Sequence, residues 1–202
     1  MANDTVQPLG AIKPMPESTG EDALNETQPR KDYREGRTYL TNGNYSQAAI
    51  SFHNALKGFE EEGDIQGVAN ASDRLGDTCM AKEEYARAIK FYSQASEICE
   101  QVDDSFSQLS LNKKLAAAYR KQGESDKAFE LLFDMLEHYR LINNPQGAVE
   151  VLIVVGELYV ETGQSTKAAD AYRTISNIHA NYKHSRLAEE FAKKAEALEQ
   201  ES

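Results

Sequence analysis

The residues that most often bind metals or act as nucleophiles are few and scattered in this chain. No histidine stands at metal-ligand spacing from another; the four are His53, His138, His179 and His184. The two cysteines, Cys79 and Cys99, form no CxxC pair and have no histidine cluster nearby. Such cysteines are typical of buried thiols in a reducing compartment. We therefore predict a cytoplasmic protein without a metal site.

Motifs that would indicate an enzyme are also missing. The sequence has no glycine-rich phosphate loop, no HExxH and no GxSxG. The run Val151–Gly156, VLIVVG, is the one stretch that resembles a buried strand leading into a phosphate-binding turn. The acidic pairs in Glu60–Glu62 and Asp103–Asp104 fall where helices are expected to end, which indicates solvated surface. We predict a non-catalytic protein without a cofactor.

The composition argues against two classes of partner. A net charge of −11 opposes non-specific binding to nucleic acid, which needs a basic surface. No apolar run approaches the roughly 20 residues that span a bilayer, and the first residues do not resemble a secretory signal. Residues 1–29 carry five acidic side chains against one lysine, and four of the five prolines. We predict a disordered N-terminal tail there, either a spacer or a regulatory peptide.

From residue 31 onward the apolar residues recur with a period of 40 residues. Small residues stand at Gly36, Gly76, Ala116 and Gly156. Alanines follow at Ala48, Ala88, Ala128 and Ala168, and large residues four positions later at Phe52, Tyr92, Leu132 and Tyr172. This spacing predicts one helical hairpin per period, because the small residues allow two helices to approach and the large ones fill the space between them. The same register places Val151–Gly156 on a helix.

Breaks between the helices repeat in the same register. Gly43, Gly123 and Gly163 are expected to end the first helix of a hairpin. Asp or Asn at the later breaks can cap the next helix. We predict hairpins over about 30–63, 64–103, 104–143 and 144–184. Residues 185–202 then form an amphipathic helix and a short tail, and this helix either caps the array or binds a partner.

These positions resemble the tetratricopeptide repeat, whose pattern contains L-G-x₂-Y and, further on, A-x₃-F. The second copy keeps Leu75, Gly76 and Ala88, and the fourth keeps Gly156 and Tyr159. The usual leading tryptophan and closing proline are absent, and the unit of 40 residues exceeds the common length of about 34, which indicates a long form. The resemblance implies an all-α, right-handed α-solenoid of four helical hairpins plus a C-terminal capping helix, and a non-catalytic protein–protein adaptor.

The resemblance also implies which positions of each first helix line the concave groove of the solenoid. The first three copies place eight cationic side chains there against two acids, whereas the fourth places three acids and three aliphatic residues. Lys114 matches a position where the family grips a peptide carboxylate, whereas Arg37 and Arg74 depart from that pattern. The groove residues predicted to bind a partner are Tyr33, Arg34, Arg37, Asn70, Arg74, Lys113, Lys114, Arg120, Lys121, Ile153, Val154 and Glu157.

A concave cationic surface attracts anionic ligands, and arginine binds a carboxylate with two parallel hydrogen bonds. We therefore expect the groove to bind an acidic peptide whose apolar anchors contact Ile153 and Val154. This interpretation requires those two side chains to be more exposed than Leu152 and Val155. Two alternatives stay open: the cations only solubilise long helices, or the basic end of one copy meets the acidic, apolar end of another in a homo-oligomer.

Overall fold

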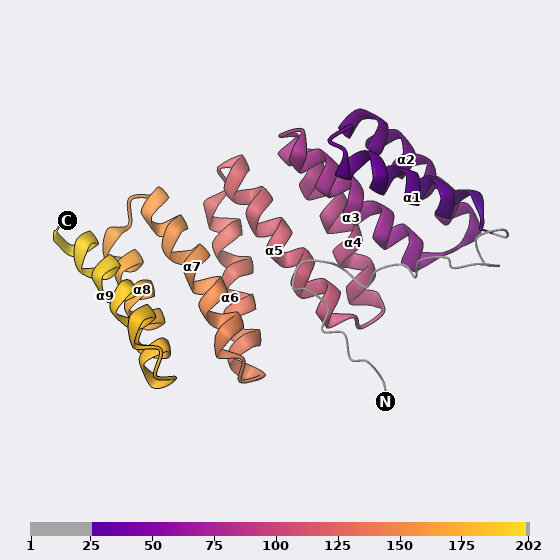
Figure 1. Cartoon of the computed structure of the whole chain (residues 1–202). Helices are drawn as coiled ribbons and strands as arrows, with labels where there is room; N and C mark the ends of the chain where they lie inside the picture. Colours follow the sequence, from indigo (N-terminus) through magenta and orange to yellow (C-terminus); the bar gives the residue numbers. More distant parts are fainter. Residues whose placement is uncertain (1–25, 201–202) are drawn as a thin grey trace. The chain divides into compact units, whose positions relative to one another are not determined.

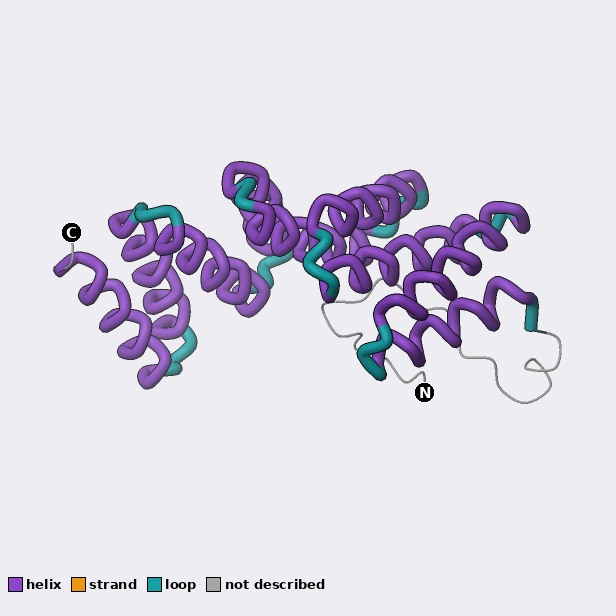
Figure 2. Tube along the Cα trace, turned by 90° about the horizontal axis from the view of Figure 1, so that it is seen from above, coloured by secondary structure: helices purple, strands orange, loops and turns teal. Residues whose placement is uncertain are grey.

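The structure is a computed structural model that describes residues 26–200, and these residues fold into helices joined by short turns (Figures 1 and 2). The predicted all-α helical repeat is confirmed, and the described residues contain no strand. Most of the predicted tail, residues 1–25, lies outside the described residues. Its predicted end at residue 29 is two residues too late, because helix α1 begins at Gln28. Pro29 suits the first helical turn, where its missing N–H costs no hydrogen bond.

The first compact unit ends at Gln122. Its five described helices are α1 (Gln28–Thr41), α2 (Tyr45–Glu62), α3 (Ile65–Ala81), α4 (Tyr85–Gln101) and α5 (Ser105–Gln122). Each helix packs against the next along the chain, and α1 also contacts α3. Phe52 and Phe59 of α2 and Leu111 of α5 are fully buried in the core of this unit.

The small residues of the 40-residue pattern let paired helices touch. A Cβ atom placed on Gly76 of α3 would lie 2.3 Å from the ring of Tyr92 on α4, and one on Gly36 would lie 2.7 Å from the ring of Phe52. Such contacts are too short for any side chain, so the aromatic ring occupies the place of the missing Cβ. The pattern of a small residue and a large one is therefore a packing requirement.

The second compact unit begins at Gly123. Its described helices are α6 (Ser125–Leu141), α7 (Pro145–Glu161), α8 (Ser165–Asn181) and α9 (Ser185–Gln200). The run Val151–Gly156 lies within α7, as the repeat register predicts. Tertiary packing overrides the modest helix propensity of its β-branched residues.

Helix α9 covers the end of the second unit. Phe191 and Ala195 of α9 join Tyr172 and Ile175 of α8 in one buried cluster, which also contains Val149 of α7. The opposite face of α9 is exposed and charged, and it carries ion pairs such as Lys193–Glu189 at 2.7 Å. An apolar inner face and a charged outer face are what a capping helix requires.

Every turn between the described helices places one residue in the left-handed region. Glycine holds this place at Gly43, Gly63, Gly123 and Gly163, with φ between 71° and 84°. Other residues hold it at Glu83, Asp103, Asn143 and Lys183, with φ between 53° and 60°. The N–H of the following residue then bonds back to the helix, as Asn44 does to the Tyr39 carbonyl at 2.8 Å. The predicted caps are confirmed at Asp64, Asp104 and Asn144, whose side chains accept a backbone N–H.

Candidate functional site

Several of the predicted groove residues in the first unit are buried. Asn70 of α3 is 1% exposed and Tyr33 of α1 is 6% exposed, and the neighbouring Asp73 of α3 is 0% exposed. A ligand on the surface of this unit cannot contact these side chains in the described conformation. They lie instead among residues of neighbouring helices of the same unit.

Charged side chains from α3 and α5 form a compact network at this place. The Lys114 Nζ atom lies 2.6 Å from Asp73 Oδ1 and 2.9 Å from Asp77 Oδ1. Arg74 lies 2.7 Å from Asp77 Oδ2 and 3.2 Å from Asp73 Oδ2. The Tyr92 hydroxyl of α4 donates a hydrogen bond to Asp77 Oδ1 at 2.9 Å. Two carboxylates therefore neutralise Arg74 and Lys114, two of the cations that the sequence assigned to a ligand.

Burial and the neighbouring charges together shift the pKa values of these groups. Loss of solvent and the nearby Asp77 raise the pKa of Asp73, while Lys114 and Arg74 oppose that rise. Burial alone would lower the pKa of Arg74, but the carboxylates of Asp73 and Asp77 raise it above its ordinary value. Burial, followed by Asp77, raises the pKa of Tyr92 above its ordinary value, so its phenol stays protonated and donates over a wider pH range. The network is an internal brace between helices.

The exposed cations of the first unit lie on α1 and α5. Arg34 and Arg37 line a cleft of about 330 Å³ on α1, together with Thr38, Thr41 and Asn42. On α5, Lys113 and Lys121 are exposed and Arg120 is half-buried. The cleft joins two guanidinium groups to hydroxyl and amide groups, a combination that suits a carboxylate or another oxyanion. The sequence identified the two arginines, but the polar residues that complete the cleft were missed.

Glu26 already places a carboxylate beside this cleft. Its Oε2 atom lies 2.9 Å from Nη1 of Arg34. Sequence reasoning assigned Glu26 to the tail and gave it no contact. Its negative charge was the only available signal, and charge alone does not reveal which arginine it meets.

The apolar positions predicted on α7 follow the expectation in part. Val155 is 2% exposed, while Ile153 and Val154 are half-buried and Glu157 is exposed. Leu152, however, is half-buried like Ile153, and both pack against the cluster of Phe191 and its neighbours. The expected contrast thus holds for Val155 and is wrong for Leu152. Because Ile153 packs against this cluster, less of its side chain is exposed to contact a partner.

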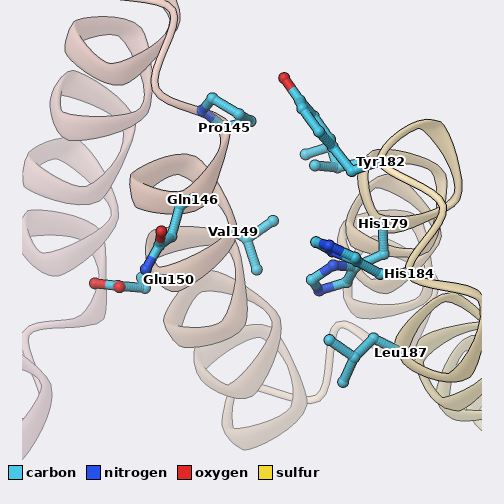
Figure 3. A pocket seen from close by; sticks show the side chains of 9 residues that line it. Pro145, Gln146, Val149, Glu150, His179, Tyr182, His184 and Leu187 are labelled. Carbon is cyan, nitrogen blue, oxygen red and sulfur yellow. The ribbon is translucent and has the colours of Figure 1, made fainter.

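The second unit contains a cavity of about 460 Å³ between α7 and the turn that joins α8 to α9 (Figure 3). It is lined by Pro145, Gln146, Val149, Glu150, Ile178, His179, Tyr182, His184 and Leu187. Figure 3 shows Val149 pointing toward the two imidazole rings, whereas the carboxylate of Glu150 extends away from them.

Aromatic rings form one wall of this cavity. The ring centroids of His179 and His184 are 5.7 Å apart, and Tyr182 is 6.5 Å from His184. His179 also stacks on Phe191 at 5.9 Å. A wall of aromatic rings favours an aromatic or aliphatic side chain, and the imidazole nitrogens can hydrogen-bond a polar group such as an indole N–H. The sequence gave no sign of a cavity at the two histidines.

Neither a metal-ligand cluster nor a membrane-spanning helix is found among residues 26–200. No group of three potential metal ligands occurs there. Both cysteines are buried and unbonded, and burial, aided by Asp104 and Asp73, raises the pKa of Cys99 to about 11. A thiol with such a pKa is a poor nucleophile at neutral pH. No helix of this part of the chain is long and apolar enough to cross a membrane.

Comparison with known proteins bears on the fold and the family. BtubC (BKLC) from P. vanneervenii is 14% identical, and the likeness covers 82% of this chain and 77% of that chain with a TM-score of 0.56. TPR-like repeats of a kinesin light chain candidate from Podosopora anserina are 17% identical over 87% of this chain and 98% of that chain, with a TM-score of 0.49. The first likeness concerns the fold alone. No curated protein matches the chain significantly.

The family model described as Tetratricopeptide repeat matches residues 67–140. This stretch lies inside the region in which small and large residues recur every 40 positions. The described residues on both sides of the match form helices of similar length, joined by turns of the same kind. Residues 67–140 therefore match the tetratricopeptide repeat family, and the flanking described helices and turns resemble those within the match.

Proposed function

We propose that the chain is a non-catalytic adaptor that binds an acidic peptide segment of a partner protein through the arginines of α1. Tetratricopeptide repeats generally mediate protein–protein interaction or scaffolding, and they are typically non-catalytic. The observation that carries the proposal is the cleft in which Arg34 and Arg37 meet Thr38, Thr41 and Asn42. The buried, unbonded cysteines favour a reducing compartment such as the cytoplasm.

The chemistry of the cleft supports an acidic ligand. Guanidinium groups bind carboxylates through two parallel N–H donors, and two arginines at positions i and i+3 lie on one helix face. The Glu26–Arg34 pair shows one guanidinium–carboxylate contact within the chain itself, between Nη1 and Oε2. Lys113 and Lys121 of α5, in the same unit, add exposed positive charge. Arg74 and Lys114 play no part in this proposal, because the carboxylates of Asp73 and Asp77 hold them.

The cavity of the second unit supplies a separate contact for an apolar anchor. Its volume of about 460 Å³ lies within the usual range of ligand pockets, which is roughly 300–1,000 Å³. An aromatic side chain of the partner matches the ring wall of His179, His184 and Tyr182. We treat the cleft and the cavity as independent contacts, one in each unit.

Peptide binding tests the acidic contact. A fluorescein-labelled peptide of six glutamates should bind the protein, and its six-glutamine counterpart should not. The double variant Arg34→Gln/Arg37→Gln should weaken binding roughly three- to tenfold, because two exposed charge pairs are lost. The control Lys57→Gln/Arg87→Gln removes two exposed cations of the same unit away from the cleft and should leave the affinity unchanged. Equal affinities of the two double variants would rule out the cleft as the binding site.

Histidine ring signals in NMR spectra test the apolar contact. Titration with N-acetyltryptophanamide should shift the ring resonances of His179 and His184, because an indole in the cavity changes their ring currents. The rings of His53 and His138 are internal controls that should stay in place. If all four histidines shift alike, or none shifts, the cavity does not bind an aromatic group.

A further inference from the structure

The ion pair between Glu26 and Arg34 links the segment before α1 to the proposed peptide site. Eight residues separate the two, which is more than two turns of helix. Neighbours on one helix face pair at i, i+3 or i, i+4, so this contact does not arise from helix geometry alone. The segment before α1 instead brings its carboxylate back along the helix toward the cleft.

The two side chains differ sharply in their exposure. Glu26 is 6% exposed, whereas Arg34 is 59% exposed. A carboxylate removed from water needs a cationic or hydrogen-bonding partner, and the Arg34 guanidinium supplies one. Arg34 still presents a large surface to solvent, and it lines the cleft beside Arg37. A second carboxylate arriving from solvent therefore meets an arginine that already holds one.

We propose that Glu26 is an intramolecular ligand of this cleft, so that an acidic peptide must displace its carboxylate from Arg34 to bind fully. This inference rests on the proposed function, because it takes Arg34 and Arg37 as the peptide site. The segment before α1 then lowers the affinity of the cleft in the resting protein. A partner rich in acidic residues overcomes the competition, whereas one with a single carboxylate does not.

Removing the Glu26 charge should therefore strengthen binding. Glu26→Gln keeps the size of the side chain, and we expect the six-glutamate peptide to bind roughly two- to fivefold more tightly, because one competing ion pair with a half-exposed arginine is lost. Glu35→Gln is the matched control, because it removes the same charge from an exposed position of α1 next to Arg34. Far-UV circular dichroism and thermal unfolding of each variant verify that α1 stays folded.

A double-mutant cycle assigns the gain to the proposed contact. In an Arg34→Gln background, Glu26→Gln should change the affinity little, because the two side chains no longer interact. The inference fails if Glu26→Gln brings no gain in a protein that binds the peptide, or if Glu35→Gln brings an equal gain. If neither wild type nor Glu26→Gln binds the peptide, the proposed function itself fails.

Discussion

Tyr92 serves two contacts at once in the first unit. Its ring fills the space next to Gly76, and its hydroxyl donates to Asp77 in the charged network. The repeat register identifies the ring as the large partner of a small residue. The hydroxyl contact was beyond sequence reasoning, because a leucine or phenylalanine at this position satisfies the same pattern. One residue therefore couples helix packing to the electrostatics of the brace.

Gly76→Ala should destabilise the protein. The added Cβ would lie 2.3 Å from the Tyr92 ring, and such overpacking costs about 1–3 kcal/mol in the free energy of unfolding. The sign is informative, because the same change at an exposed helical site stabilises by about 1 kcal/mol. Chemical denaturation followed by circular dichroism measures the change.

The third repeat suggests a rescue for this variant. It carries Ala116 and Leu132 where the second carries Gly76 and Tyr92. Gly76→Ala/Tyr92→Leu should regain part of the lost stability, although it forgoes the hydrogen bond to Asp77. A Gly76→Ala protein as stable as wild type would contradict the packing argument.

At the scale of elements, α3 is the helix that ties the first unit together. Its acidic residues Asp73 and Asp77 bind Lys114 of α5, and Asp77 also accepts the Tyr92 hydroxyl of α4. Opposite charges on neighbouring helices fix the register between them, because sliding one helix by a turn would separate the pairs. The sequence predicted an open cationic groove at this point of the unit, and the structure instead has this network of ion pairs.

Lys114→Met should destabilise the first unit strongly. It leaves the buried Asp73 and the partly buried Asp77 with Arg74 as their remaining cation, and breaking a buried pair in this way costs about 3 kcal/mol. Lys57→Met is the control, since Lys57 is 79% exposed and lies 3.7 Å from an exposed Glu61. Its unfolding free energy should stay within about 0.5 kcal/mol of wild type. Similar losses in both variants would show that Lys114 acts as an ordinary surface lysine.

The sequence predicted the helices far better than the contacts between their polar side chains. The register of Gly76, Ala88 and Tyr92 depends on packing alone, so it predicts the helix pairs. The meeting of Lys114 with Asp73, 41 residues apart, depends on helix tilt and side-chain rotamers, which the pattern does not encode. For the same reason the sequence did not predict the cavity at His179 and His184. It also predicted that Leu152 is buried, whereas Leu152 is half-buried.

At the scale of the whole molecule, the net charge of −11 repels an acidic partner. Binding must therefore depend on short-range contacts, because salt screens charges farther apart than about 8–10 Å at physiological ionic strength. In the proposed complex the carboxylate would contact Arg34 and Arg37 directly, at a separation within that distance. Self-assembly remains a prediction.

The turns between the described helices could be made more stable by substitution. Glu83 and Lys183 adopt a left-handed backbone at which a side chain costs about 1 kcal/mol or more, while Asp103 tolerates it better and glycine occupies the equivalent place in four other turns. Asn143 pays less, because asparagine tolerates this conformation. Replacing these residues with glycine should raise the free energy of unfolding, because all of these turns share the same backbone conformation. Among the turns between the described helices, half already have glycine at the left-handed position and half do not.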